Sequence, residues 1–261
     1  MRLVIHSDYE KASRWAARYI AGKINAQNKN KPFVLGLPTG SSPLGIYKEF
    51  VKMHKEGKLS FKNVRTFNMD EYIGLPPSHP QSYHYFMMEN LFNHIDIDKK
   101  HVHMLDGMAK DLDTECRLYE EKITAEGGID FFLGGMGGDG HIAFNEPGSS
   151  LVSRTRMKTL TMESRLANAR FFEGNLDKMP TTALTVGVGT VMDSREIMLI
   201  VSGRAKSRAL KAVIEEGINH MWTVSCLQMH PKAVIVCDDE ATEELKVGTV
   251  NYFKDLEKDN L

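Results

Sequence analysis

Residues 129–150 read IDFFLGGMGGDGHIAFNEPGSS, an apolar run that leads into a loop rich in glycine. The run IDFFLGG (129–135) predicts a buried strand, and GMGGDG (135–140) matches the pattern G-x-G-x-x-G. A dinucleotide-binding loop with that pattern opens a helix, whereas HIAFNEPG has no helical period and ends in Pro-Gly. The stretch therefore predicts a strand and a loop of an α/β fold that has no dinucleotide site.

Short apolar runs alternate with amphipathic segments along the rest of the chain. We expect further strands at 2–6, 33–37, 64–69, 101–105, 155–162, 183–189, 196–203 and 232–238. We expect helices at 9–26, 42–56, 82–94, 111–126, 205–216 and 241–257, the first with a capping box of Ser7 and Glu10. This order predicts a three-layer α/β fold, Rossmann-like, with a mostly parallel open sheet and helices on both faces.

The length of 261 residues fits a single α/β domain over residues 1–261. One segment differs from the rest, because residues 160–182 are polar and charged and contain Gly174 and Pro180. We name residues 160–182 the lid segment. Its composition is equally consistent with a mobile lid over a site and with an ordinary surface helix and loop.

The composition argues against several classes of partner. With 42% hydrophobic residues and a formal net charge of −1, the chain has no bias toward nucleic acid or an anionic membrane. No apolar run reaches the length of a membrane span, and MRLVIHSDYE lacks the apolar region of a signal peptide. Cys116, Cys226 and Cys237 have no metal-ligand or redox spacing, which favours packing thiols in a reducing cytoplasm.

Unusual residues follow several of the expected strands. The PTGSS loop (residues 38–42) follows one strand, Asp70 and Glu71 follow another, and the SGRAK loop (residues 202–206) follows a third. The glycine loop (residues 134–150) follows the run quoted above. Ligands of open parallel sheets bind outside the carboxyl ends of the strands. We therefore expect these segments to build one site together.

Two of these loops have the features of an anion site. The PTGSS loop places backbone N–H groups at the start of an expected helix, where the helix dipole also favours an anion. No Gly-Lys-Ser/Thr follows, so this is not a Walker A loop. Lys206 begins another expected helix. Together they indicate a phosphate monoester, although each alone is equally a capped turn or a solvated lysine.

The ionisable residues of the glycine loop indicate proton chemistry. Asp139 and His141 are two residues apart and point the same way in extended backbone, and Glu146 follows. Histidine titrates near neutrality and serves as acid or base. No third ligand has convincing metal spacing, so we expect no metal. Of the neighbours Asp70 and Glu71, at most one should face the pocket, because adjacent strand residues point to opposite faces.

Six segments together carry a resemblance to a known family: LGLPTGSSP, FNMDEYIGL, GGMGGDGHIAFNEPGSSL, SRTR, ALTVGVGT and NHMWTVSCLQMHPKAVIVCD. They resemble the glucosamine-6-phosphate deaminase family, in order and without a large gap from Met1 to about Leu256. The resemblance implies an aldose–ketose isomerisation coupled to loss of ammonia, with no cofactor and no metal. Glucosamine 6-phosphate and water would give fructose 6-phosphate and ammonia.

The same resemblance implies roles for individual residues. Asp70 corresponds to the general base that moves a proton from C2 to C1, and His141 to the group that opens the sugar ring. Asp139 and Glu146 correspond to the acids that pair with it. Glu71 matches a neighbouring acid, whose role the resemblance does not separate from that of Asp70. The substrate phosphate would be bound by Thr39, Gly40, Ser41, Arg170 and Lys206.

The family's regulated members are hexamers that bind N-acetylglucosamine 6-phosphate at a subunit interface. The positions that match this allosteric site are Ser149, Ser150, Arg156, Lys158, Thr159 and Tyr252. The residues alone show that Arg154, Arg156 and Lys158 alternate along one strand face. Such a cationic stripe is equally typical of a solvated edge strand. The expected partners are thus an amino-sugar phosphate, this activator and further copies of the chain.

Two other functions are compatible with the same architecture. A sugar-phosphate lactonase of this fold would need no proton transfer at C2, so the carboxylate of FNMDEY would be dispensable. A sugar-phosphate sensor without catalysis would need no acid–base set. The continuation of the glycine loop as IAFNEP, followed by SRTR, favours the deaminase over the lactonase.

Overall fold

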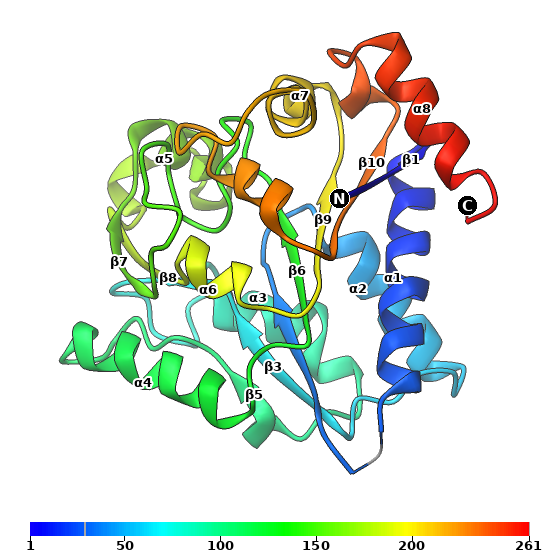
Figure 1. Cartoon of the computed structure of the whole chain (residues 1–261). Helices are drawn as coiled ribbons and strands as arrows, with labels where there is room; N and C mark the ends of the chain where they lie inside the picture. The colour runs from blue at the N-terminus through cyan, green and yellow to red at the C-terminus, as the bar shows by residue number, and fades with distance from the viewer. Residues whose placement is uncertain (29, 261) are drawn as a thin grey trace.

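The structure of the chain is a computed structural model that describes residues 1–28 and 30–260, without the side chains of Glu163, Ala167, Arg170 and Phe171. Its centre is a parallel sheet of seven strands in the order β1-β10-β9-β6-β2-β3-β5 (Figure 1). The strands are β1 (Arg2–His6), β2 (Phe33–Leu37), β3 (Val64–Asn68), β5 (Val102–His103), β6 (Phe131–Gly135), β9 (Ile197–Val201) and β10 (Ala233–Asp238).

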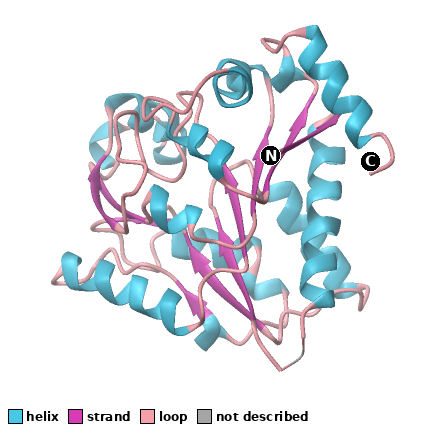
Figure 2. Cartoon of the chain, viewed as in Figure 1, coloured by secondary structure: helices cyan, strands magenta, loops and turns pink. Residues whose placement is uncertain are grey.

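Helices cover both faces of this sheet, as Figure 2 shows. The helices are α1 (Tyr9–Ala26), α2 (Leu44–Lys55), α3 (Tyr83–Asn90), α4 (Leu112–Ala125), α5 (Met162–Asn168), α6 (Val188–Met192), α7 (Ser207–Glu215) and α8 (Val247–Glu257). Short 3-10 helices are η1 (Phe92–His94), η2 (Lys99–His101), η3 (Ala169–Phe172), η4 (Leu176–Lys178), η5 (Arg204–Lys206), η6 (Thr223–Met229) and η7 (Glu240–Thr242). None of the helices in the described residues is long and apolar enough to cross a membrane.

The core has one part on each face of the sheet, because successive strand residues point to opposite faces. On β9, Leu199 packs with α4, α6 and α7, whereas its neighbour Ile200 packs with α1, α2 and α3. Both side chains are fully or almost fully buried. The predicted fold class, an open parallel sheet between two layers of helices, is therefore confirmed.

The chain reverses the direction in which it adds strands at the boundary between β2 and β6. After β2 it continues to β3 and β5 on one side, and after β6 it continues to β9 and β10 on the other. The loops after β2 and β6 therefore diverge, and a crevice opens between them at the carboxyl ends of the strands. The PTGSS loop and the glycine loop are these two loops.

A second, antiparallel sheet has the order β4-β8-β7 and consists of β4 (Asp70–Tyr72), β8 (Thr182–Thr185) and β7 (Arg156–Thr159). The sequence did not predict this sheet, since the segments of β7 and β8 were counted toward the parallel one and residues 70–72 were placed after a strand. The chain leaves the parallel sheet at Met69, whose N–H donates to Leu37 (3.0 Å) and whose carbonyl accepts from Val186 (2.8 Å). Asp70 and Glu71 therefore lie within β4 rather than after β3.

Several predicted boundaries also need correction. Asp8, not Ser7, caps α1, because its carboxylate accepts a hydrogen bond from the Lys11 N–H at 2.7 Å. The helix expected at 82–94 is α3 followed by η1, and the strand expected at 155–162 is only the four residues of β7. Met162, the last residue of that expected strand, instead begins helix α5.

Candidate active site

A pocket of about 260 Å³ lies at the carboxyl end of the sheet, between the diverging loops. Six of the residues predicted for the site line it: Thr39, Gly40, Ser41, Asp70, His141 and Lys206. Residues of the lid segment also line it, namely Ser164, Asn168 and Phe172. The side chain of Arg170, predicted for phosphate binding, lies outside the described residues. Loops from distant parts of the chain therefore meet, as expected, around one pocket at these positions; the roles of their residues stay predictions.

A tyrosine of α1, Tyr9, contacts the backbone of the PTGSS loop and of the first turn of α2. The Tyr9 hydroxyl lies 2.9 Å from the Ser42 carbonyl oxygen and 3.2 Å from that of Ser41. The Gly45 N–H, in the first turn of α2, donates to the same hydroxyl at 2.8 Å. These contacts turn two carbonyl dipoles toward Tyr9, and the start of α2 contributes the positive end of its dipole. This arrangement would suit an anion.

The SGRAK loop is fixed by a buried acid at the end of β10. Asp238 accepts hydrogen bonds from the N–H groups of Gly203 (3.0 Å) and Ala241 (3.0 Å) and from the Ser202 hydroxyl. Lys206 follows in η5, where its side chain borders the pocket. The sequence predicted Lys206 but gave no sign of Asp238, because the contact joins two strands that are far apart in the chain.

The glycine loop turns sharply instead of running extended. The Gly140 N–H donates to the Gly137 carbonyl at 3.1 Å, and Gly140 has a φ of +74°. A Cβ on Gly137 would lie 2.4 Å from the His141 ring, so only glycine fits there. The extended backbone expected for Asp139 and His141 is therefore wrong. Their side chains still meet, because the turn folds one back toward the other.

His141 lies between two acids. Its Nδ1 is 2.6 Å from Asp139 Oδ1 and 3.9 Å from Glu146 Oε2. Burial raises the pKa of Asp139, but the hydrogen bond and charge of His141 outweigh this effect, and the net shift is downward. An ionised Asp139 orients the imidazole ring through this contact. Glu146 is almost fully buried and accepts a hydrogen bond from the Ser164 hydroxyl at 2.6 Å.

The same three side chains have ligand atoms within 4.8 Å of one another, a spacing that also suits a metal ion. Asp139 already occupies Nδ1 of His141, the nitrogen that faces both acids. A metal shared by all three residues would have to replace that contact. The sequence-based expectation of no metal stays a prediction.

Asp70 is buried in β4 and faces the pocket, with 7% of its surface exposed. Burial and then the charge of Glu71 raise the pKa of the Asp70 carboxyl to about 8. Glu71 points to the opposite face and borders a separate cavity together with His84 and Asp106. The prediction that only one of the two acids faces the pocket is confirmed.

An aromatic wall that the sequence did not predict closes one side of the pocket. The Tyr83 ring is nearly parallel to that of Phe144, with centroids 6.2 Å apart, and its hydroxyl donates to that of Tyr72 at 3.1 Å. Phe172 of the lid segment packs edge-on against Tyr72, with centroids 5.8 Å apart. The wall joins β4, α3, the glycine loop and the lid segment. No single segment carries a pattern that would have revealed it.

The family described as "Glucosamine-6-phosphate isomerases/6-phosphogluconolactonase" matches residues 7–237, which is most of the chain. The chain belongs to this family. A protein of Treponema denticola named glucosamine-6-phosphate deaminase is 62% identical over all of this chain and 97% of its own length. One of Phocaeicola vulgatus with the same name is 61% identical, with 100% of each chain covered.

Two solved structures place the fold within the family. One, described as a monomeric glucosamine-6-phosphate deaminase, has a TM-score of 0.88 and 40% identity, and covers 92% of this chain and 98% of its own. The 6-phosphogluconolactonase of Trypanosoma brucei has a TM-score of 0.74 with 19% identity and covers 94% and 98%. The second likeness concerns the fold alone.

The six positions matched to the regulated members of the family lie outside the pocket. Arg156, Lys158 and Thr159 belong to β7, whereas Tyr252 lies on α8 with 61% of its surface exposed. Ser149 is buried and Ser150 exposed in the glycine loop. Figure 1 places β7 and α8 at opposite ends of the molecule. One copy of the chain therefore does not bring Tyr252 to the other five positions.

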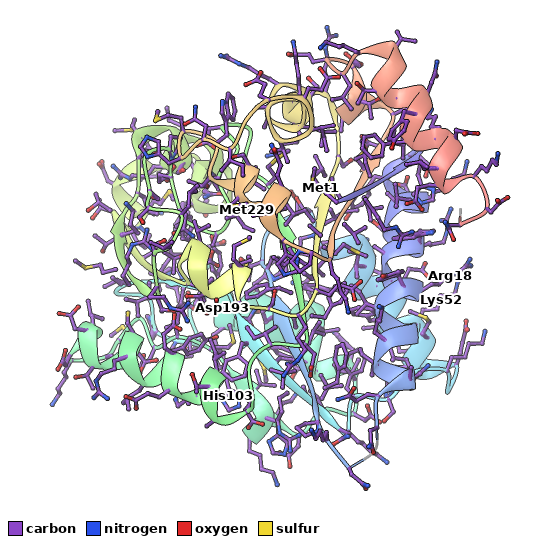
Figure 3. All side chains as sticks on the ribbon, viewed as in Figure 1. Met1, Arg18, Lys52, His103, Asp193 and Met229 are labelled. Carbon is purple, nitrogen blue, oxygen red and sulfur yellow. The ribbon has the colours of Figure 1, made fainter. Side chains whose placement is uncertain are left out.

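The cationic stripe is shorter than the sequence suggested. Arg154 precedes β7, and its guanidinium lies 2.6 Å from Glu120 and 2.5 Å from Asp193, a residue labelled in Figure 3 at the end of α6. Arg154 thus has two carboxylate partners within the chain. Arg156 and Lys158 remain half-buried on β7, where burial lowers the pKa of Arg156. Only these two continue the stripe along the strand.

Proposed function

We propose that the chain is a glucosamine-6-phosphate deaminase, which converts glucosamine 6-phosphate and water to fructose 6-phosphate and ammonia. The observation that carries the proposal is one pocket that holds a buried carboxylate, Asp70, and a carboxylate-paired histidine, His141, beside two anion-binding loops. Isomerisation of an aldose to a ketose needs such a base and a ring-opening group at close range. The names of relatives about 60% identical over the whole chain support it.

The first role is to bind the phosphate away from the reacting carbons. The N–H groups of Thr39, Gly40 and Ser41 at the start of α2 and the ammonium of Lys206 would share the anion. Arg170 joins this set by its family match. Binding energy from the phosphate then holds C1 and C2 in place for the proton transfer.

The second role is to open the pyranose ring. His141 would take the proton from the C1 hydroxyl and return one to the ring oxygen, which gives the open-chain amino aldehyde. Asp139, 2.6 Å from Nδ1, would hold the ring and stabilise its cationic form. Glu146 would add negative charge behind the histidine, at 3.9 Å.

The third role is the isomerisation. Asp70 would remove the proton from C2 and deliver it to C1 through an enolamine, while the aldehyde oxygen gains a proton and becomes the C1 hydroxyl. The resulting C2 imine takes up water and releases ammonia. A buried carboxyl whose pKa is about 8 holds the transferred proton firmly, which suits a base that must remove hydrogen from carbon.

We further propose that the lid segment covers the bound sugar. Ser164, Asn168 and Phe172 border the pocket, so their movement would open it to solvent. Residues 1–261 would act as one domain around this site. Its three cysteines are free and buried, in keeping with a reducing cytoplasm.

Regulation is a separate part of the proposal. We propose that Ser149, Ser150, Arg156, Lys158, Thr159 and Tyr252 bind N-acetylglucosamine 6-phosphate across an interface between copies of the chain, in a hexamer. The separation of Tyr252 from the other positions supports an interface site. A relative described as monomeric shows that the family does not require this assembly.

Ammonia release from glucosamine 6-phosphate, followed in a coupled assay, tests the activity. We expect the wild-type chain to release ammonia, and Asp70→Asn to lose turnover by about three powers of ten or more while it still binds the substrate. Full turnover by Asp70→Asn would contradict the role of the base. Hydrolysis of a sugar-phosphate lactone without ammonia release would favour the lactonase.

A further inference from the structure

Glu71 is a buried acid directly beside Asp70 that has no part in the mechanism above. Only 3% of its surface is exposed, and it borders a cavity of about 230 Å³ on the far side of β4 from the pocket. Burying a carboxylate is costly unless hydrogen bonds compensate it. The hydrogen bonds of the Glu71 carboxylate therefore indicate its structural role.

Three backbone N–H groups point at the Glu71 carboxylate. Oε1 accepts from Tyr72 (2.9 Å) and Tyr83 (2.9 Å), and Oε2 accepts from His84 (2.8 Å). Tyr83 and His84 are the first two residues of α3, and the third N–H, of Tyr85, donates to the Ser82 hydroxyl. Glu71 thus satisfies two N–H groups that the helix itself leaves unpaired. The helix dipole and these donors favour the ionised form.

The first turn of α3 also carries part of the pocket wall. Tyr83 lies against Phe144, and its hydroxyl donates to that of Tyr72, the residue after Glu71. The contacts of Glu71 therefore join the strand that presents Asp70 to the helix that presents Tyr83. Loss of those contacts would loosen both sides of the same pocket.

We propose that Glu71 is a positioning residue for the deaminase reaction: its carboxylate fixes the start of α3 to β4, and its charge makes the adjacent Asp70 a stronger base. The inference rests on the proposed function of Asp70. Burial raises the pKa of Glu71, its three N–H donors oppose that rise, and the charge of Asp106 adds to it, so that the net shift is upward. When Glu71 is ionised, its charge adds to burial in raising the pKa of Asp70 to about 8.

Other titratable groups around Asp70 do not replace this effect. Four tyrosines interact with its charge, from α2, β4, α3 and α4, and burial raises the pKa of each above 10, so they are neutral near pH 8: Tyr47, Tyr72, Tyr83 and Tyr119. His141 and Lys206 face Asp70 across the pocket. Among these groups Glu71 is the one that contributes negative charge.

Two substitutions of Glu71 separate the effect of its charge from the effect of its side-chain length. Glu71→Gln keeps the shape, removes the charge and leaves a single acceptor oxygen, whereas Glu71→Asp keeps the charge but shortens the side chain by one methylene. We measure kcat and kcat/KM for ammonia release across pH. In Glu71→Gln the acid limb of kcat/KM should move down by about one pH unit and kcat should fall about tenfold. In Glu71→Asp kcat should fall while the limb stays near its wild-type position.

If a folded Glu71→Gln variant keeps the acid limb of kcat/KM at its wild-type pH, the charge of Glu71 does not act on Asp70. If Glu71→Asp keeps the wild-type kcat, the contacts of Glu71 with the start of α3 do not position the pocket. If Glu71→Gln does not fold, as judged by circular dichroism, the Glu71→Asp result decides the anchor. Infrared difference spectra against the matching Asp70→Asn variants follow protonation of Asp70 without turnover. Absence of ammonia release by the wild type would therefore refute the deaminase, while the infrared titrations of wild type, Glu71→Gln and Glu71→Asp would still decide the charge effect.

Discussion

The features that suit Asp70 to its proposed role as a base also affect the stability of the fold. Burial and the charge of Glu71 raise the pKa of Asp70 from 3.8 to about 8 in the folded chain. The folded state therefore binds this proton more tightly than the unfolded state does. The protonated Asp70 carboxyl therefore contributes to the free energy of unfolding in full below the pKa that Asp70 has in the unfolded chain. This contribution is lost as the pH rises through the pKa of the folded state, between about pH 4 and pH 8.

Substitution of Asp70 by asparagine should remove this pH dependence. The free energy of unfolding of Asp70→Asn relative to wild type should rise between pH 5 and pH 8, by up to about 1.4 kcal/mol for each pH unit. Denaturant titrations at several pH values measure it. Asp255→Asn, an exposed acid on α8, serves as the control and should show no such trend. A constant difference across this range would mean that Asp70 titrates normally.

At the scale of elements, the sequence predicted those pocket loops that begin where an apolar strand gives way to glycine or other small residues. IDFFLGG ends in glycines and FVLGL is followed by PTGSS, so both strand ends and their loops could be predicted from the sequence. The change of sheet at Met69 could not be, because VRTFNMDEY contains no Gly or Pro and nothing in it shows that the chain pairs with a second sheet after Met69. A single residue that bonds to both β2 and the segment after β8 makes that change.

The sequence also missed contacts that only the folded chain creates. Tyr83, Ser164 and Asp238 come from separate segments, and their contacts with Tyr72, Glu146 and Gly203 join residues at least 11 positions apart in the chain. Local periodicity carries no information about such pairs. His141 and Asp139 were predicted to meet, but through an extended backbone rather than the turn that brings them together.

Helix α5 of the lid segment offers a test at this scale, because Ser164 donates a hydrogen bond to the proposed catalytic acid Glu146. Ser164→Ala would leave that buried carboxylate without the donor, and hydrogen bonds to charged groups contribute more than neutral ones. We expect kcat to fall about tenfold, with a smaller change in KM. Ser164→Thr keeps the hydroxyl and should retain most of the activity. Wild-type kcat in Ser164→Ala would show that α5 does not position Glu146.

At the scale of the whole molecule, the small sheet connects the pocket to the proposed effector site. Asp70 on β4 and Arg156 on β7 are both register partners of Thr185 on β8. Neighbouring strands are about 4.8 Å apart, so the two backbones lie about 10 Å from each other across β8. A ligand that shifts β7 would act on the strand that carries the proposed base. Such coupling requires that the ligand bind one arrangement better than another.

Arg156→Ala tests that connection. If Arg156 binds the phosphate of N-acetylglucosamine 6-phosphate, its loss should abolish activation by that sugar without lowering maximal turnover, because the residue lies outside the pocket. Initial rates of ammonia release with and without the acetylated sugar measure this. Arg18→Ala, on α1 and labelled in Figure 3, is the control and should remain activated.

The assembly state of the wild type must be measured by sedimentation beside the rates, since Tyr252 reaches the other five positions only from another copy of the chain. A monomer that is still activated would place the effector elsewhere, and activation that survives in Arg156→Ala would remove Arg156 from the site.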